Sequence, residues 1–105
     1  MMDNNNLKYE FMVEIDLPMP FSNEFISLIP EQRAVITKLF SDKLLTSYSV
    51  SLEHGKLWTT IIAETDNEVA DILMDFPIIE YCEYKIFRLA FHNNSGFIIP
   101  QFSLN

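Results

Sequence analysis

The feature that most constrains the fold is a strict two-residue alternation near the start of the chain. Apolar or aromatic residues stand at every second position: Tyr9, Phe11, Val13, Ile15 and Leu17. The residues between them are Glu10, Met12, Glu14 and Asp16. Because successive side chains of a strand point to opposite faces of a sheet, this pattern predicts a strand over residues 9–17 with one buried face. Pro18 then ends the strand, since proline cannot donate a hydrogen bond to a neighbouring strand.

The next segment predicts a helix with a break in it. Ser22 suits an N-cap, and apolar side chains then recur every three to four residues as far as Lys43. Pro30 interrupts the run, but proline is favoured in the first turn of a helix and Glu31 suits the positive end of the helix dipole. We therefore expect a short helix, a break near Ile29 and a longer helix.

A hairpin and a second helix follow. Residues 47–52 alternate again and residues 57–64 are rich in β-branched and aromatic side chains, so both predict strands. Between them Gly55 can adopt the positive φ of a tight turn. Thr65 and Glu68 match a helix capping box, and an apolar stripe then runs to Phe76, where Pro77 ends the helix. Residues 81–91 predict the last strand.

The predicted order is βαββαβ, which is typical of the α+β ferredoxin-like fold. We expect a four-stranded antiparallel sheet with two helical segments on one face. The organisation this predicts is a flexible lead-in over residues 1–8, one domain over residues 9–92 and an apolar tail over residues 93–105. The tail contains Phe97-Ile98-Ile99-Pro100-Gln101-Phe102, which should pack on its own domain or, as an arm, on another subunit. The open face of the sheet and this tail together predict self-association.

Composition excludes several classes of partner. The chain has 105 residues, with 7 basic and 15 acidic side chains, for a formal net charge of −8. Such a charge disfavours nucleic acid and anionic membranes as partners. Cys82 is the sole cysteine, so no intrachain disulfide forms. The N-terminal residues lack a signal-peptide pattern and no apolar run approaches the roughly 20 residues of a membrane span, which predicts a cytoplasmic protein.

Several stretches of the chain resemble the muconolactone isomerase-like branch of the dimeric α/β-barrel proteins. They span about residues 9–94, and the most specific is the one that follows the second helix. These stretches are Asp16-Leu17-Pro18, Ile29-Pro30-Glu31-Gln32-Arg33, Lys56-Leu57-Trp58, Phe76-Pro77-Ile78-Ile79-Glu80-Tyr81 and Leu89-Ala90-Phe91-His92-Asn93-Asn94. The resemblance implies a homodimer or higher homo-oligomer in which two sheets pack face to face as a barrel. It also implies a cofactor-free isomerase that moves a proton within a small lactone or organic acid.

Such an isomerase needs a general base and a donor that stabilises an enolate. Glu14 and His92 are the candidate catalytic residues: Glu14 points to the face without helices, and His92 follows the last strand. Each also has a structural interpretation: Glu14 as part of a solvated strand face, and His92 as a strand-end histidine bonded to backbone. The candidate ligand-pocket residues are Tyr48, Trp58, Tyr84 and Arg88, although packing in the core or an interface would equally explain the aromatic ones.

The sequence offers no metal or phosphate site. It has no Cys/His spacing for a metal, no glycine-rich phosphate loop and no nucleophile elbow. Two further functions remain open: a non-catalytic homo-oligomer that binds a small ligand or serves as an assembly module, and a heme-degrading or quinol-type monooxygenase.

Overall fold

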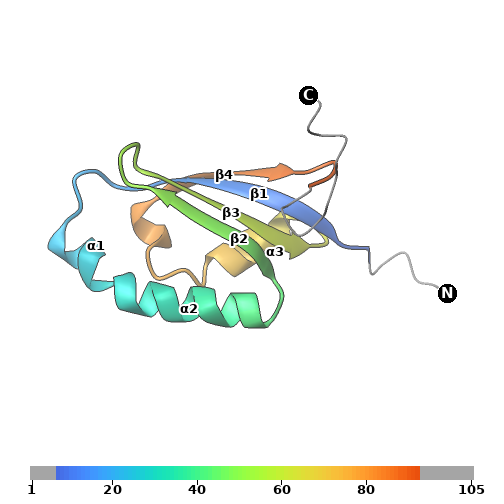
Figure 1. Ribbon diagram of the computed structural model, residues 1–105, viewed down its shortest axis with the longest axis horizontal. Helices are drawn as coiled ribbons and strands as arrows, with labels where there is room; N and C mark the ends of the chain where they lie inside the picture. Colours follow the sequence, from blue (N-terminus) through green and yellow to red (C-terminus); the bar gives the residue numbers. More distant parts are fainter. Residues whose placement is uncertain (1–6, 93–105) are drawn as a thin grey trace, which may run out of the picture.

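A computed structural model describes residues 7–92, and its elements follow the predicted order (Figure 1). The elements are β1 (Tyr9–Asp16), α1 (Asn23–Ser27), α2 (Ile29–Ser41), β2 (Leu45–Ser51), β3 (Lys56–Ala63), α3 (Asp66–Leu73), the 3₁₀ turn η2 (Ile79–Tyr81) and β4 (Glu83–Arg88). Most of the predicted lead-in and the whole of the predicted tail lie outside the described residues, so both stay predictions.

The four strands form one antiparallel sheet in the order β2-β3-β1-β4. The helices all lie on one side of this sheet, and the other side carries no element of residues 7–92 (Figure 1). This confirms the ferredoxin-like α+β fold. The pairing places Glu14 of β1 between Trp58 of β3 and Lys85 of β4, so these three side chains share the open face.

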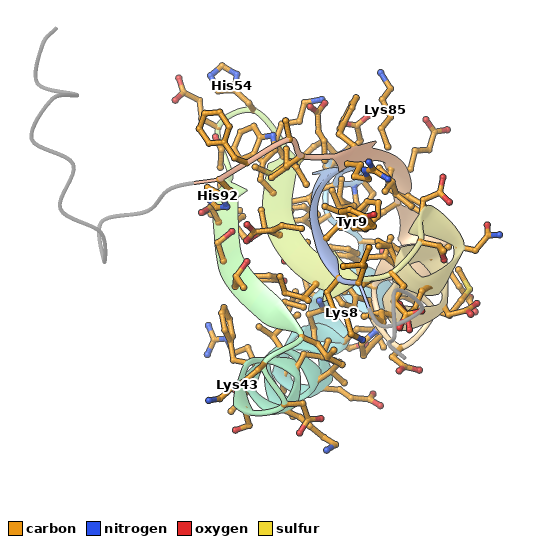
Figure 2. All side chains as sticks on the ribbon, turned by 90° about the vertical axis from the view of Figure 1, so that its right-hand side faces the viewer. Lys8, Tyr9, Lys43, His54, Lys85 and His92 are labelled. Carbon is orange, nitrogen blue, oxygen red and sulfur yellow. The ribbon has the colours of Figure 1, made fainter. Side chains whose placement is uncertain are left out.

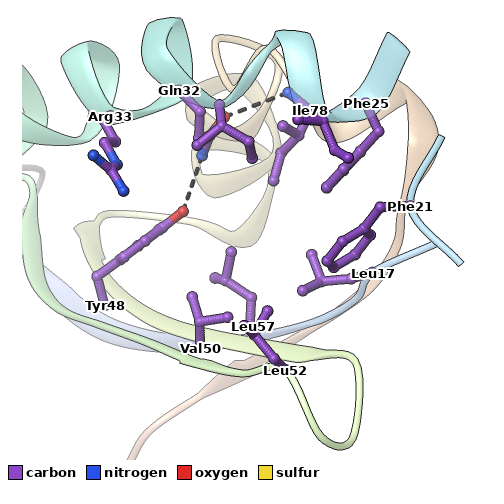
Figure 3. Close-up of a pocket in the computed structure, with 12 residues that line it drawn as sticks. Leu17, Phe21, Phe25, Gln32, Arg33, Tyr48, Val50, Leu52, Leu57 and Ile78 are labelled. Carbon is purple, nitrogen blue, oxygen red and sulfur yellow. Dashed lines mark hydrogen bonds between the residues drawn. The ribbon is translucent and has the colours of Figure 1, made fainter. Parts of the chain in front are cut away.

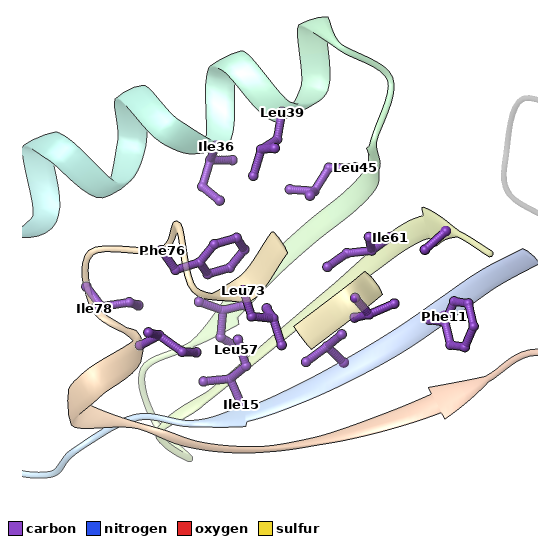
Figure 4. Packing of buried hydrophobic residues seen from close by; sticks show 14 of the residues in the cluster. Phe11, Ile15, Ile36, Leu39, Leu45, Leu57, Ile61, Leu73, Phe76 and Ile78 are labelled. Atoms are coloured by element: carbon purple, nitrogen blue, oxygen red, sulfur yellow. The ribbon is translucent and has the colours of Figure 1, made fainter. Parts of the chain in front are cut away.

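The hydrophobic core lies between the sheet and the helices (Figure 4). Val13 and Ile15 of β1 are completely buried, as the alternation along that strand predicts. Val69 and Leu73 of α3 pack over the same cluster and are also inaccessible to solvent. Burying a side chain of this size contributes about 1.5–3 kcal/mol relative to leaving it exposed, which explains why the sheet holds the register that keeps the apolar face inward.

The helix boundaries follow their capping residues. Ser22 Oγ accepts from the backbone N–H of Phe25 at 3.1 Å, and Pro30 is the second residue of α2, so the predicted break falls at Leu28. Thr65 Oγ1 accepts from the N–H of Glu68 at 3.1 Å. The Glu68 carboxylate reaches back to the backbone N–H of Glu64, at 2.6 Å. Thr65 therefore caps the helix as predicted, and Glu68 reaches back one residue beyond this N-cap.

Several boundaries differ from the sequence prediction, and the hydrogen bonds explain the differences in α3, β4 and β2. The helix α3 ends at Leu73 and not at Phe76. The backbone N–H groups of residues 75 and 76 bond to carbonyls three positions back, which is the pattern of a 3₁₀ turn and not of an α-helix. β4 covers residues 83–88 and not 81–91, since Tyr81 closes the turn η2. β2 begins at Leu45, two residues early, where a register shift between Leu45 and Ser47 extends the pairing.

Candidate functional site: a cavity between the helices and the sheet

A cavity of about 470 Å³ lies between the α1–α2 segment and the end of the sheet formed by β2 and β3 (Figure 3). Most of its wall is apolar. The apolar lining residues are Leu17, Phe21, Phe25, Ile26, Ile29, Val50, Leu52, Leu57 and Ile78. Three polar residues complete the lining: Gln32, Arg33 and Tyr48. An apolar cavity of this size with a few polar groups is typical of a small-molecule site.

Gln32 fixes the polar side of the cavity. Its side chain is 3% exposed and forms two hydrogen bonds. Its Oε1 accepts from the backbone N–H of Ile78 at 3.4 Å, and its Nε2 donates to the Tyr48 hydroxyl oxygen at 3.2 Å. Because a backbone N–H can only donate, this contact determines which end of the amide faces Tyr48. Gln32 thus ties α2 to both the strand β2 and the segment before η2.

The Tyr48 phenol remains a free donor. Its oxygen accepts from Gln32, and no acceptor for its hydroxyl hydrogen is found among residues 7–92. Burial raises the pKa of Tyr48, and the hydrogen bond from Gln32 opposes this only in part. The phenol therefore stays protonated at neutral pH and can donate to a group in the cavity.

Arg33 lies at the rim of the same polar region. Its side chain is exposed, and no carboxylate of the described residues lies within 4.0 Å of its guanidinium. In Figure 3 it extends from α2 on the same side of the cavity as the Tyr48 phenol. The cavity lining includes neither a carboxylate nor an imidazole from the described part of the chain.

Glu14 lies on the face of the sheet without helices, as the alternation along β1 predicts. Lys56 Nζ donates to Glu14 Oε2 at 3.0 Å and lies 2.5 Å from an oxygen of Asp16. These two carboxylates raise the pKa of Lys56, the contact with Asp16 being the larger cause. Trp58 is the cross-strand neighbour of Glu14 and shares this open face. Neither Glu14 nor Trp58 lines the cavity.

His92 lies beside Glu10, not beside Glu14. Its Nδ1 is 3.1 Å from a carboxylate oxygen of Glu10, in an orientation that makes no hydrogen bond. The same Glu10 oxygen accepts from the hydroxyl of Thr46. Thr46 Oγ1 is also 2.5 Å from the hydroxyl of Thr60, a side chain that is completely buried. The two candidate catalytic residues therefore belong to separate polar groups on the open face, one at each end of β1 (Figure 2 labels His92).

The remaining candidates face the helices. Tyr84 pairs with Ile15 and packs on the edge of the core without lining the cavity. Arg88 pairs with Phe11, and its guanidinium lies 4.1 Å from the centre of the Tyr9 ring. Arg88 lines a second, smaller cavity of about 280 Å³. The other residues that line it are Phe11, Glu64, Thr65, Asp66 and Ile86.

Of the four predicted ligand-pocket residues, Tyr48 is the one that lines the larger cavity. Gln32 and Arg33 line the cavity but were not among the predicted pocket residues. A signal for Gln32 was present, since this polar residue stands on the apolar stripe of α2 with Ile36 and Leu39. A polar residue on the buried side of a helix needs hydrogen-bond partners inside the fold. Arg33 gave no comparable signal, because an exposed arginine on a helix is ordinary.

No family model and no curated protein sequence matches the chain. Comparison of structures does find relatives in fold. The structure of muconolactone isomerase superposes with a TM-score of 0.65 at 16% sequence identity, covering 86% of this chain and 97% of that one. The structure of PH0061 superposes with a TM-score of 0.54 at 9% identity, covering 87% of this chain and 57% of that one.

These likenesses establish the fold that muconolactone isomerase has. They agree with the family resemblance of the sequence. They show architecture alone, because chains at this level of identity can share a fold and differ in chemistry. Within residues 7–92 no helix is long and apolar enough to cross a membrane. Among the same residues no three His, Cys, Asp or Glu side chains gather closely enough to hold a metal ion.

Proposed function

We propose that this protein binds a small, mainly apolar molecule in the cavity between α1–α2 and β2, and that it acts as a homo-oligomer. The observation that carries the binding proposal is the cavity itself. Nine apolar side chains form most of its wall, and the polar part of the wall consists of Gln32, Arg33 and Tyr48. The hydrogen bonds of Gln32 with Tyr48 and Ile78 hold this polar part in place before any ligand arrives. A preformed site of this kind binds with little ordering cost.

Substitution at the mouth of the cavity tests this proposal. Val50 lines the cavity and is 47% exposed, so Val50→Trp can fill the entrance without disturbing the core. A panel of small aromatic and aliphatic compounds is titrated into both proteins by ligand-observed NMR. We expect the natural chain to bind members of the panel, and we expect the Val50→Trp variant no longer to bind them. Met74→Trp, at an exposed position after α3, is the control that should bind as the natural chain does. Equal binding by the Val50 variant would place the ligand elsewhere.

A second candidate is a cofactor-free isomerase acting on a small lactone or organic acid. The likeness in fold to muconolactone isomerase and the protonated Tyr48 phenol, a donor suited to an enolate oxygen, favour it. Its base would be Glu14 or His92, and neither lines the cavity. Non-catalytic binding is therefore the better-supported proposal. Lactone turnover that Tyr48→Phe and either Glu14→Gln or His92→Gln abolish would favour the isomerase instead.

The open face of the sheet supports the proposal of self-association. Phe87 lies on that face and is 48% exposed, next to the half-buried Met12 that it pairs with in β1. Two such faces packed together would remove this apolar surface from water. Light scattering on the purified protein should give a dimer or larger mass, and Phe87→Glu should lower it while Met74→Glu does not. A monomeric natural chain at micromolar concentration would refute this part. A cytoplasmic location stays a prediction.

A further inference from the structure

We propose that the ligand of this cavity is an amphipathic monocarboxylic acid, with its carboxylate held by Arg33 and Tyr48 and its hydrocarbon body lying against the apolar wall. This inference rests on the proposed binding function and assigns it a chemical class and an orientation. The polar groups of the cavity lie at one side of it, and the aromatic side chains Phe21 and Phe25 lie at the other (Figure 3).

The polar side of the cavity offers donors. The acceptor oxygen of Gln32 is occupied by the backbone N–H of Ile78, and the Tyr48 oxygen already accepts from Gln32. Gln32 Nε2 keeps a second N–H, but this residue is 3% exposed. The donors open to a ligand are therefore the Tyr48 hydroxyl hydrogen and the guanidinium of Arg33, which can only donate. A ligand group that meets both must be an acceptor, and a carboxylate accepts from two donors at once.

Charge favours an anion over other acceptors at this point. No acid among residues 7–92 lines the cavity, so an ammonium group would meet the Arg33 charge without a counter-charge from them. Four basic residues of the described chain have no carboxylate within 4.0 Å, and Arg33 is the one of them that lines this cavity; the others are Lys43, Lys85 and Arg88. A net charge of −8 repels anions in general. An anionic ligand therefore needs a local positive charge, here the Arg33 guanidinium, in order to approach the cavity.

The apolar wall limits the rest of the ligand. Phe25, Leu57 and Ile78 are each 2% exposed and supply no hydrogen-bond partner from their side chains. A sugar or a polycarboxylate would lose its hydration there without replacement, at considerable cost. The volume of about 470 Å³ suits one compact hydrocarbon group. The ligand therefore has one charged end and an uncharged, unsubstituted body.

Matched probes that differ only at the polar end test this class. The full chain is titrated by calorimetry with 2-naphthoate and with 2-naphthamide, and again with octanoate and octanamide. We expect the acid to bind about tenfold more tightly than the amide in at least one pair, as a charge-assisted hydrogen bond implies. Arg33→Gln should remove most of that preference and leave amide binding unchanged. Arg88→Gln, outside this cavity, is the matched control and should change neither.

The possible outcomes separate the two proposals. If both acid and amide bind equally, and Val50→Trp still excludes both, the ligand class is wrong and the binding function stands. If the acid keeps its preference in Arg33→Gln, the carboxylate is held elsewhere and the orientation is wrong. If no probe of either pair binds at millimolar concentration, both the ligand class and the proposed binding function fail. A preference that Arg33→Gln abolishes and Tyr48→Phe weakens supports the inference.

Discussion

The side-chain amide of Gln32 donates to the hydroxyl of Tyr48 at 3.2 Å, joining α2 to β2 across the polar side of the cavity. The two residues are sixteen positions apart, and the same amide accepts from the backbone of Ile78, forty-six positions further along the chain. One buried side chain therefore connects three segments that surround the cavity.

Gln32→Leu should destabilise the fold by about 1–3 kcal/mol, because it leaves the buried N–H of Ile78 without a partner. The free energy of unfolding in urea measures this. Thr37→Leu, on the exposed side of the same helix, is the control and should change stability by less than about 0.5 kcal/mol. Equal stability of Gln32→Leu and the natural chain would show that the hydrogen bonds of Gln32 contribute nothing net.

Tyr48→Phe should change how stability depends on alkaline pH. Burial raises the pKa of Tyr48 above the value of 10.0 that it has when unfolded. Above pH 10 the unfolded chain therefore loses the phenol proton while the folded chain keeps it, and the free energy of unfolding falls as pH rises. In Tyr48→Phe this fall should be smaller. The pKa of Lys56 is also raised, so the free energy of unfolding still falls to some extent with rising pH in both proteins. Urea titrations between pH 8.5 and 11 measure it, and parallel curves would contradict the prediction.

Cys82 should react slowly with thiol reagents in the folded protein. Burial, with a smaller contribution from the charge of Asp16, raises the pKa of this thiol from 9.0 to about 11. Its Sγ also lies 3.3 Å from the carbonyl oxygen of Ile78, to which it donates. Since the thiolate is the reactive form, the rate of alkylation by iodoacetamide at pH 8 should be roughly 100-fold lower than in denaturant. A rate similar to that of the unfolded chain would show that the thiol is not protected.

Thr60→Val should cost about 1–2 kcal/mol of stability although the two side chains have nearly the same shape. The Thr60 hydroxyl is completely buried and lies 2.5 Å from that of Thr46 and 2.6 Å from that of Ser47. Its removal leaves those two hydroxyls without a shared partner. Ser49→Ala, at an exposed position on the same face of β2, is the control and should be nearly neutral. Thermal unfolding by circular dichroism compares the variants.

Thr65→Ala should lower stability by about 0.5–2 kcal/mol through the loss of the N-cap of α3. Asn67→Ala, in the first turn of the same helix, removes no capping bond and is the matched control. Chemical unfolding of both variants measures the difference. If the two lose the same stability, the cap is not what holds the start of this helix.

The sequence by itself determined the fold, because local patterns along the chain are enough to specify it. Alternation from Tyr9 onward defined which face of β1 is buried, Pro30 defined where the first helical segment breaks, and Thr65 with Glu68 defined where α3 begins. Each of these signals acts between residues a few positions apart. Their combination left the ferredoxin-like order as the consistent arrangement.

Only the tertiary structure decided the site, because its residues come together from distant parts of the chain. Register decided that Lys85 shares the open face with Glu14 and that Arg88 faces the helices. Packing decided that His92 lies beside Glu10. The meeting of Gln32 with Tyr48 depends on how α2 lies over β2, and no local pattern encodes that distance. A site built from long-range contacts becomes visible once the chain has folded around it.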